Sequence, residues 1–418
     1  MLYYKEYKQK INFMFTKKGT IIDKNRINEV LARGVEEVIV KEELEKKMAS
    51  GKKLRVKFGI DPTGSVLHLG HTVPLRKLRE FQDLGHQVIL LIGDFTARIG
   101  DPTGRASARK PMTDKEIKDN MKSYTKQVGM ILDMKKVEVR YNSEWLAKLS
   151  FKDLILLTSK VTYAQVSQRA DFKERIKNDM DLSLQEFMYP VMQGYDSVML
   201  KADIEIGGTD QKFNLLMGRQ LQKRYDQEQQ DVVTCPLLEG LSGGDKMSKS
   251  LNNYIALTEK SEDMYGKIMS LTDDLIVKYF ELCTYLPMEE IESIKQQLKG
   301  GKVNPRDLKM RLGFEIVKIY HGEKEALKAQ EHFVKTVQKK EIPEEIQMIK
   351  IQETRYKLID LLLEVKLSTS KSEARRLIEQ GGVKVNNEVV QDANREIEIT
   401  KEGVLLQRGK RQFVKVVR

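Results

Sequence analysis

Apolar and polar residues follow one another along the first quarter of the chain in a pattern that predicts alternating strands and helices. The apolar run at 54–60 predicts a strand, and the polar turn at 61–64 follows it. Residues 75–81 place apolar side chains on one helix face, and the continuous apolar run at 88–92 predicts a parallel strand buried on both faces. This order predicts a Rossmann-like, doubly wound parallel α/β sheet, in which ligands bind at the carboxyl ends of the strands.

Later segments predict more helix around the second half of this sheet. Residues from about 30 to 48 and from about 112 to 187 are expected to be mostly helical, the second segment as an insertion, and 202–206 is expected to be a strand. The predicted division is an N-terminal extension at 1–30, for which disorder is one interpretation, a catalytic domain at 31–258 that contains the insertion, an α-helical domain at 259–345, a linker at 346–355 and a small α+β domain at 356–418.

The predicted C-terminal domain has its own local signals. Ser370 and Glu373 have the spacing of a capping box before a helix. Asn386 and Asn387 separate two short β-type runs, as in a hairpin whose turn requires positive φ. From residue 353 onward there are 14 basic and 10 acidic residues, and this excess of positive charge suits contact with phosphates.

The composition limits the class of protein. The chain has 418 residues, 40% hydrophobic and 32% charged, and it contains no run of 18 apolar residues, so we expect no membrane span. Its net charge of +12 indicates by itself only a solvated basic surface. Cys235 and Cys283, the only cysteines, lack zinc-type spacing and fit a reducing cytoplasm. The lysine-rich first twenty residues lack the apolar core of a signal peptide.

Two histidines mark the first candidate site. His68-Leu69-Gly70-His71 follows the first predicted strand and begins the next helix. There, side-chain donors and the helix dipole both favour a phosphate, and Gly70 allows a nucleotide to approach the backbone closely. Zinc binding would need two more ligands, which the remaining histidines do not supply as a cluster. A purely structural capping role is the other alternative.

Two lysines mark the second candidate site. Lys246-Met247-Ser248-Lys249-Ser250 follows the flexible segment Gly243-Gly244-Asp245. A pair of lysines with this spacing is usually part of a solvated loop. After glycines, however, it suits a mobile loop that closes on pyrophosphate as charge develops in the transition state. The histidine tetrad and the lysine pentad, in this order, resemble the nucleotide site of a class I aminoacyl-tRNA synthetase.

Two further patterns are weaker alone. Asp101-Pro102-Thr103-Gly104-Arg105, with Arg109 beyond it, is a polar turn after a core strand. Tyr189, Gln193 and Asp196 are spaced by four and three residues and so share one helix face. An ordinary turn and an ordinary polar helix face are the alternatives.

All these motifs together resemble those of bacterial tyrosyl-tRNA synthetases, from about residue 30 to the end of the chain. The matching motifs are HLGH at His68, GDPTG at Gly100, Y-x-x-x-Q-x-x-D at Tyr189, GGTDQ at Gly207 and KMSKS at Lys246. The C-terminal domain is similar to the small RNA-binding domain first described in a ribosomal small-subunit protein, the S-four type. The helical domain at 259–345 corresponds to the anticodon-recognition domain of the family.

The resemblance implies a role for each matching residue. The implied tyrosine-binding residues are Asp101, Tyr189 and Gln193 for the amino group, Asp196 for the phenolic hydroxyl and Gln211 near the carboxylate. The implied ATP-binding residues are Gly59, Asp61, Thr63, Gly70, Gly208, Asp210, which would bind the ribose, and Lys249. The implied catalytic residues are His68, His71, Arg105, Arg109, Lys246, Lys249 and Ser250. In the RNA-binding domain the candidate residues are Arg375, Arg376 and Lys384.

The resemblance also implies the reaction and the partners. Tyrosine and ATP with Mg²⁺ would form tyrosyl-adenylate and pyrophosphate, and the tyrosyl group would then move to the terminal ribose of tRNA(Tyr). The substrate carboxylate is itself the nucleophile, so no general base is obligatory. No metal site made of protein ligands alone is expected. Members of the family are homodimers, with the inserted helical region at the interface and one tRNA in contact with both subunits.

This chain departs from the common family pattern at two positions. Lys57 stands where many members have a tyrosine that contacts the phenol, so that phenol recognition would depend mainly on Asp196; a surface strand end is the simple interpretation of Lys57. Pro74 replaces a small residue near the nucleotide, and proline is tolerated in a first helical turn. We therefore expect only a small effect of Pro74 on ATP affinity.

Three other functions compete with this one. A small-molecule nucleotidyltransferase such as a pantothenate synthetase also has an HxGH tetrad, but it needs neither the full KMSKS motif nor a C-terminal RNA-binding domain. A tryptophanyl enzyme shares the fold but should lack Asp196 in this setting. A non-catalytic RNA-binding relative is the third alternative, and the two intact signature motifs oppose it.

Overall fold

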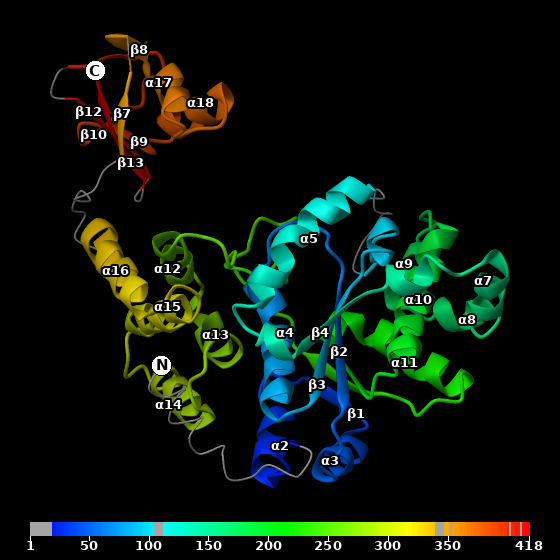
Figure 1. Cartoon of the computed structure of the whole chain (residues 1–418). Coiled ribbons are helices and arrows are strands. Elements are labelled where there is room, and N and C mark those ends of the chain that lie inside the picture. Colours follow the sequence, from blue (N-terminus) through cyan, green and yellow to red (C-terminus); the bar gives the residue numbers. More distant parts are fainter. Residues whose placement is uncertain (1–18, 104–111, 339–346, 352, 401–402, 410–411) are drawn as a thin grey trace. The chain divides into compact units, whose positions relative to one another are not determined.

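The computed structural model describes residues 19–103, 112–338, 347–351, 353–400, 403–409 and 412–418, and Figure 1 shows the labelled elements. Contacts divide the chain into two compact units, Met1–Lys260 with Lys267–Leu312, and Ser261–Gly266 with Gly313–Arg418. None of the described helices is long and apolar enough to cross a membrane.

The first unit contains a six-stranded sheet. Its strands are β1 (Glu37–Ile39), β2 (Arg55–Ile60), β3 (Gln87–Ile92), β4 (Val137–Tyr141), β5 (Ile204–Gly208) and β6 (Asp231–Cys235). They lie in the order β1-β6-β5-β2-β3-β4, and every neighbouring pair is parallel except β1 with β6. The chain runs outward from β2 to β4 and then returns on the other side through β5 and β6. The order of strands therefore reverses between β2 and β5, and this is where an open α/β sheet has its ligand crevice. The predicted doubly wound sheet is confirmed.

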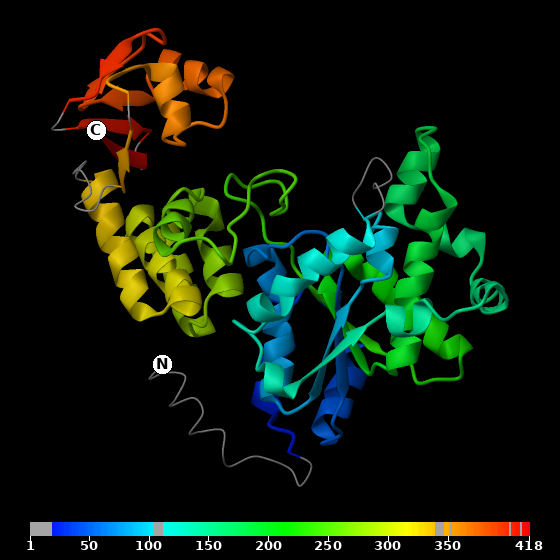
Figure 2. The ribbon, with the colours of Figure 1, turned by 45° about the horizontal axis from the view of Figure 1, so that its top comes forward.

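Helices lie on both faces of this sheet, and further helices pack on those rather than on the strands. They are α2 (Lys24–Val30), α3 (Lys41–Ala49), α4 (Leu69–Asp83), α5 (Asp114–Val128), α6 (Ser143–Leu146), α7 (Phe151–Thr158), α8 (Tyr163–Val166), α9 (Ala170–Lys177), α10 (Leu184–Leu200) and α11 (Lys212–Arg224). Figures 1 and 2 show α4 on one side of the strands and α10 with α11 on the other. Because β3 lies between these layers, its residues 88–92 are all buried, as its continuous apolar run predicted.

Three expectations about this unit were wrong in detail. Residues 24–30 form a helix with buried Ile27 and Val30, so they belong to the fold rather than to an extension. Residues 37–39 form the edge strand β1 instead of continuing a helix, because they pair with β6. Residues 137–141, inside the predicted helical insertion, form β4 beside β3. In the last two cases a short segment takes its conformation from a neighbouring strand, which local periodicity cannot show.

The segment after the first sheet is helical, as predicted, over its described residues. Its helices are α12 (Ser261–Met269), α13 (Ile276–Cys283), α14 (Met288–Lys299), α15 (Pro305–His321) and α16 (Glu323–Phe333). Helices α13 and α14 belong to the first compact unit and α16 to the second, so the division by contacts differs from the predicted domain limits.

The C-terminal part forms a small α+β fold. Its elements are β7 (Gln347–Lys350), β8 (Arg355–Lys357), α17 (Leu358–Glu364), α18 (Lys371–Glu379), β9 (Val383–Val385), β10 (Glu388–Val389), β11 (Glu396–Glu398), β12 (Val404–Arg408) and β13 (Gln412–Val417). Five strands lie in the order β10-β9-β12-β13-β7, and a two-stranded sheet joins β8 to β11. Strand β7 pairs in parallel with β13, so the predicted linker at 346–355 contains part of this sheet.

The hairpin and the helix cap predicted for this part both form. Asn386 and Asn387 have φ of +48° and +73° between the paired strands β9 and β10, which confirms the hairpin. The Ser370 hydroxyl accepts from the Glu373 amide at 3.2 Å, so the predicted cap forms. The Glu373 carboxylate, however, accepts from the amide of Thr369 at 2.7 Å, one residue before the predicted partner.

Candidate active site

A cleft of about 630 Å³ opens at the carboxyl ends of β2 and β5. It brings together all the predicted catalytic and substrate-binding residues that the structure describes. These are Gly59, Asp61, Thr63, His68, Gly70, His71, Asp101, Tyr189, Gln193, Asp196, Gly208, Asp210, Gln211, Lys246, Lys249 and Ser250. Arg105 and Arg109 lie outside the described residues. Arg375 and Arg376 are exposed on α18, and Lys384 is on β9, so these three candidates belong to the C-terminal fold.

The two histidines form the N-terminal cap of α4. The His68 amide donates to His71 Nδ1 at 3.1 Å, and the two rings lie 3.7 Å apart. Burial, with the nearby charge of Lys249, lowers the pKa of His71 to about 3, and burial with the neighbouring ring lowers that of His68 to about 2. Both rings are therefore neutral at pH 7. Because Nδ1 of His71 accepts a hydrogen bond, its proton lies on Nε2, where it can be donated to a ligand.

Gly70 allows this helix start to pack tightly. A Cβ at this position would lie 3.1 Å from the His68 ring and 3.5 Å from Cβ of Met247. The absence of a side chain therefore avoids a crowded contact with the His68 ring, whereas the distance to Met247 is an ordinary van der Waals contact. The histidine tetrad also has the structural capping role that was the alternative interpretation, since His71 caps the helix.

The lysine pentad is anchored beside the histidines. Gly243 and Gly244 precede it with φ of +73° and +80°, and the Met247 amide donates to the carbonyl of Leu238 at 2.7 Å. Lys246 Nζ lies 2.7 Å from a carboxylate oxygen of Asp210, and Lys249 Nζ donates to the carbonyl of Val66 at 3.1 Å. Both lysines line the cleft.

Backbone pairing fixes the chain that follows the pentad to the start of α4. The Leu69 amide donates to Ile255 O at 3.0 Å, and the Leu257 amide donates to Leu67 O at 2.9 Å. The two signature motifs are about one domain apart in sequence, and this short antiparallel contact keeps them adjacent in space.

Asp196 lies at the bottom of the cleft with two side-chain donors. It accepts from Trp145 Nε1 at 2.8 Å and from Asn142 Nδ2 at 3.3 Å. Burial raises the pKa of this carboxyl to about 7, and the charge of Lys57 acts in the opposite direction. Sequence reasoning missed Trp145 and Asn142 because residues 137–141 were expected to be helical. Its position directly after the edge strand β4 was the signal that could have identified Asn142.

A second buried carboxylate, that of Asp61, is linked to Asp196 by a chain of hydrogen bonds. Asp61 accepts from the Tyr189 hydroxyl at 2.9 Å and from the Thr96 hydroxyl at 2.8 Å. Thr96 accepts in turn from Asn142 at 3.0 Å, which connects Asp61 to Asp196. Burial, with the charges of Asp101 and Asp196, raises the pKa of Asp61 to about 7, although the two hydroxyl donors oppose this. Thr96 was also missed, although it follows the predicted strand at 88–92.

Gln193 on α10 and Gln211 just before α11 line the cleft wall, and polar side chains hold the wall residues in place. The Gln211 amide donates to Asp101 at 2.7 Å, and Asn214 donates to the side-chain carbonyl of Gln193 at 2.9 Å. The buried Arg169 guanidinium lies 3.4 Å from Asp101. Arg169 and Asn214 were missed, because nothing in their local sequence separates them from ordinary helix residues.

The two residues that depart from the family pattern are not where the sequence suggested. Lys57 is fully buried in the middle of the sheet, not at a surface strand end, and it lines the cleft. Pro74 is the sixth residue of α4, one turn beyond the expected first turn. Since proline has no amide hydrogen, the Gly70 carbonyl lacks its usual helical donor, and both residues line the cleft.

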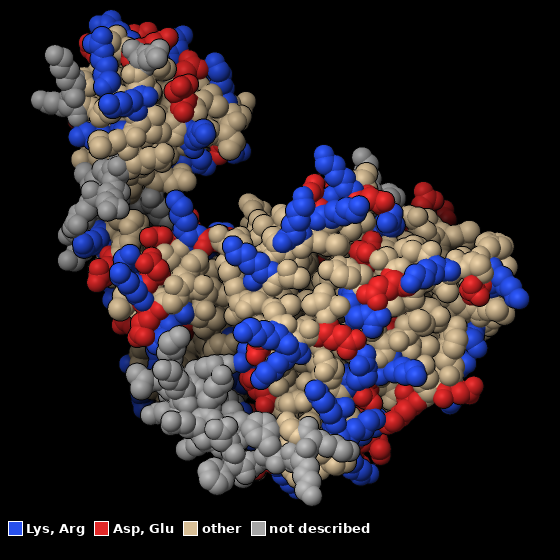
Figure 3. Space-filling view, in the orientation of Figure 1, with Lys and Arg blue, Asp and Glu red and all other residues tan. Residues whose placement is uncertain are grey.

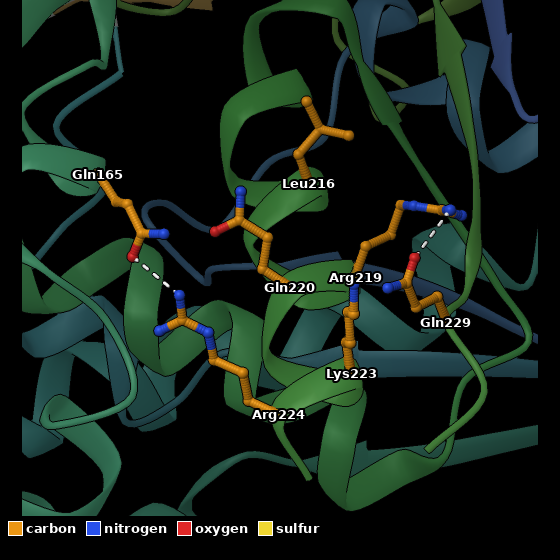
Figure 4. A pocket seen from close by; sticks show the side chains of 7 residues that line it. All are labelled: Gln165, Leu216, Arg219, Gln220, Lys223, Arg224 and Gln229. Carbon is orange, nitrogen blue, oxygen red and sulfur yellow. Dashed lines mark hydrogen bonds between the residues drawn. The ribbon is translucent and has the colours of Figure 1, made fainter. Parts of the chain in front are cut away.

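A second cavity, of about 620 Å³, lies between α8 and α11 (Figure 4). Its lining residues are Gln165, Leu216, Arg219, Gln220, Lys223, Arg224 and Gln229. Arg224 donates to Gln165 at 3.3 Å and Arg219 to Gln229 at 3.1 Å. The cavity contains no carboxylate and none of the predicted site residues, so the cleft at β2 and β5 is the candidate active site.

Family models match almost the whole chain. The model described as tRNA synthetases class I (W and Y) matches residues 48–338, and that of the tyrosine–tRNA ligase SYY-like C-terminal domain matches residues 338–416. The chain therefore belongs to the class I aminoacyl-tRNA synthetases, in the family that includes the tryptophan and tyrosine enzymes.

The most similar relatives are tyrosine–tRNA ligases. The enzyme of Thermotoga maritima is 50% identical over 387 residues, 93% of this chain and 96% of its own length. That of Moorella thermoacetica is 49% identical over 391 residues, 93% of this chain and 94% of its own length. Within the family, the chain is thus a tyrosine–tRNA ligase. The motif-based resemblance is confirmed, and the tryptophanyl, small-molecule and non-catalytic alternatives are not supported.

A solved structure shares the fold. The tyrosyl-tRNA synthetase of Archaeoglobus fulgidus, complexed with L-tyrosine, matches with a TM-score of 0.60 at 23% identity, covering 74% of this chain and all of that one. This similarity confirms the class I synthetase architecture that the sheet order indicates.

Proposed function

We propose that the cleft holds tyrosine and Mg-ATP side by side and joins them as tyrosyl-adenylate. The observation that carries this proposal is that one cavity contains both the phosphate-facing motifs and a buried carboxylate suited to a phenol. A tyrosine carboxylate oxygen would attack the α-phosphorus, and the bond from that phosphorus to the β-bridging oxygen would break. Pyrophosphate would leave with the electron pair of this bond.

The nucleotide end supplies donors and positive charge. The neutral His68 and His71 would donate to phosphate oxygens, and Lys246 with Lys249 would meet the leaving pyrophosphate, with Ser250, Arg105 and Arg109 on neighbouring loops. Asp210, now 2.7 Å from Lys246, would accept from the ribose hydroxyls, so that ATP and Asp210 would share this lysine. Gly59, Asp61, Thr63, Gly70 and Gly208 would line the rest of the nucleotide site.

Magnesium would enter with the nucleotide. Among the described residues, no group of three histidine, cysteine, aspartate or glutamate side chains is placed to hold a metal ion. Mg²⁺ is commonly bound through substrate phosphates and only one or two carboxylates, so a site without a protein cage fits Mg-ATP as the substrate.

The tyrosine end supplies acceptors. Asp196 would accept the phenolic O–H, and Asp101, Tyr189 and Gln193 would hold the ammonium group, with Gln211 near the carboxylate. The Asp101 carboxylate, which accepts from the Gln211 amide at 2.7 Å, places an acceptor for the ammonium group beside these residues and supports this orientation.

Tyrosine-dependent exchange of pyrophosphate into ATP tests the proposal. We expect exchange with tyrosine and almost none with tryptophan or phenylalanine, because only tyrosine offers Asp196 a phenolic O–H. Exchange with tryptophan but not with tyrosine would contradict the proposal.

The pH dependence of tyrosine use follows from the buried carboxyls. Burial raises the pKa values of Asp61 and Asp196 from 3.8 to about 7, so both become protonated as pH falls through 7. An ionised Asp196 is the better acceptor for the phenol. We therefore expect kcat/KM for tyrosine to be flat above pH 7 and to fall by about tenfold per unit below it. Exchange rates measured at saturating ATP above and below pH 7 would show this acidic fall. Equal values of kcat/KM for tyrosine at acidic and neutral pH would refute the prediction.

The C-terminal fold and the helical segment would bind tRNA. Figure 3 shows lysines and arginines mixed with acidic residues over the visible face, so the net charge alone does not locate an RNA surface there. The exposed Arg375 and Arg376, with Lys384 on β9, are the proposed contacts to phosphates. Binding through phosphates should weaken steeply as salt increases.

A truncation separates tRNA binding from adenylate formation. Because β7 pairs with β13, the deletion should remove 339–418 rather than begin inside the sheet. We expect exchange to be unchanged and tRNA charging to fall by about tenfold or more. In the full chain, Arg375→Ala with Arg376→Ala should likewise lower charging alone. Loss of exchange in the truncated chain would show instead that this fold supports the catalytic core.

A homodimer through the inserted region is also proposed. Large apolar side chains on α7, α8 and α10 are more than half exposed, among them Phe151 at 78% and Leu184 at 84%. Such a group of exposed apolar side chains is typical of a surface that a partner covers. Sedimentation equilibrium would give the mass of the assembly. We place the enzyme in the cytoplasm, in keeping with its two free thiols.

A further inference from the structure

A buried ion pair lies beneath the tyrosine end of the cleft. Lys57 Nζ and Glu205 Oε1 are 2.8 Å apart, and both side chains are at most 1% exposed. Lys57 comes from β2 and Glu205 from the adjacent β5, at the point where the strand order reverses. The pair therefore joins the two halves of the sheet directly below the substrate site.

Every hydrogen of the Lys57 ammonium has an acceptor within the protein. Besides Glu205, Nζ donates to Ser197 Oγ at 2.9 Å and to the Gln193 carbonyl at 3.3 Å. An ammonium group has three donors, so Lys57 cannot donate to a phenol unless one of these bonds breaks. Ser197 passes its own hydrogen to the other carboxylate oxygen of Glu205, at 2.9 Å. Lys57 thus does not replace the direct phenol contact of a tyrosine.

What Lys57 does contact is the helix turn that carries the phenol acceptor. Gln193 and Ser197 are four residues apart on α10, and Asp196 lies between them. Because the Lys57 ammonium donates to both Gln193 and Ser197, it fixes the distance of this helix turn from β2 and its rotation about the helix axis. The ammonium charge also acts on Asp196, where it opposes the effect of burial on the carboxyl.

We propose that Lys57 and Glu205 form a positioning pair that sets Asp196 for tyrosine, because together they hold its helix turn against the sheet. This inference rests on the proposed role of Asp196 as acceptor of the phenol. It predicts that the pair affects tyrosine binding and its pH dependence, and not the binding of ATP.

Several charged and polar groups face Asp196 and affect the protonation of its carboxyl. Lys57 and Glu205 act from β2 and β5 with opposite signs, and the neutral donors Trp145 and Asn142 approach from the segment after β4. The Asp61 carboxylate, beyond β2, is affected by the charge of Asp196, and so is the Tyr189 hydroxyl on α10. Among these groups Lys57 is the cation. Its removal should therefore raise the pKa of Asp196.

The test uses the full chain with Lys57→Met, which keeps the length of the side chain and removes its charge. We expect KM for tyrosine in pyrophosphate exchange to rise by about tenfold, the cost of a misplaced hydrogen-bond acceptor, with KM for ATP unchanged. The acidic limb of kcat/KM for tyrosine should also move to higher pH. Lys52→Met is the matched control, because it removes a lysine 2.8 Å from Asp203 at the other end of β2.

A second variant covers the case in which Lys57→Met does not fold, since Glu205 would be left buried without its cation. Lys57→Met with Glu205→Gln removes both charges, and we expect it to fold, to keep the raised KM for tyrosine and to show a smaller shift of the acidic limb. An unchanged KM for tyrosine and an unchanged limb in the folded variant would overturn the inference. So would an equal rise of both KM values. Absence of tyrosine-dependent exchange in the wild type would instead contradict the proposed function.

Discussion

Replacement of Lys249 by alanine is expected to lower the rate of adenylate formation by about 10²–10³-fold, the usual cost of removing one group that stabilises transition-state charge. The ammonium group stands beside the capped start of α4, where on the proposed function the departing pyrophosphate would gain negative charge. Because this charge develops only during the reaction, kcat should fall while KM for ATP changes little.

Pyrophosphate exchange and a single-turnover measurement of adenylate would both show this loss. Lys46→Ala is the matched control, since Lys46 is an exposed lysine on α3 whose ion pair, among the described residues, is with Glu43. A large rise in KM for ATP with unchanged kcat would show that Lys249 binds the ground state instead. A wild-type rate would remove Lys249 from the catalytic group.

Replacement of Asp196 by asparagine is expected to remove most of the preference for tyrosine over phenylalanine. Tyrosyl-tRNA synthetases are the reference case for this kind of discrimination, about 10⁵-fold against phenylalanine. The physical reason is that phenylalanine leaves a buried acceptor without its hydrogen bond, whereas tyrosine supplies one. In the variant, Asn142 and Trp145 still surround position 196, but the charged acceptor is gone.

We expect kcat/KM for tyrosine to fall by about 10²–10³-fold and that for phenylalanine to change little. Asp119→Asn, at a half-exposed carboxylate on α5, should leave both values unchanged. An equal fall for both amino acids would indicate a damaged fold rather than a lost contact, and thermal unfolding of the variant would distinguish the two. Retained selectivity would contradict the role of Asp196.

These outcomes also bear on how far a sequence determines a site. The histidine tetrad, the lysine pentad and the Tyr189–Asp196 helix face were all recognisable in the chain, because each is a local pattern on one element. The structure places their members in one cleft. It also adds Thr96, Asn142 and Trp145, which join Asp61 to Asp196 or hold Asp196 in place. Thr96 and Asn142 each follow a strand, but no motif marks these three residues, since their role depends on which strand ends meet in the fold.

Local sequence determined the central strands, the helix starts and the Asn386–Asn387 hairpin, because periodicity, capping and positive φ act within a few residues. Only the tertiary structure decided the edge strands β1 and β4, whose pairing partners lie elsewhere in the chain. It also decided the state of Lys57. A lysine in a strand is usually solvated, and this one is buried because Glu205, Ser197 and Gln193 converge on it from other elements. The free energy of burying a charge depends on such partners, which are set by how the elements pack and not by the residues beside it in sequence.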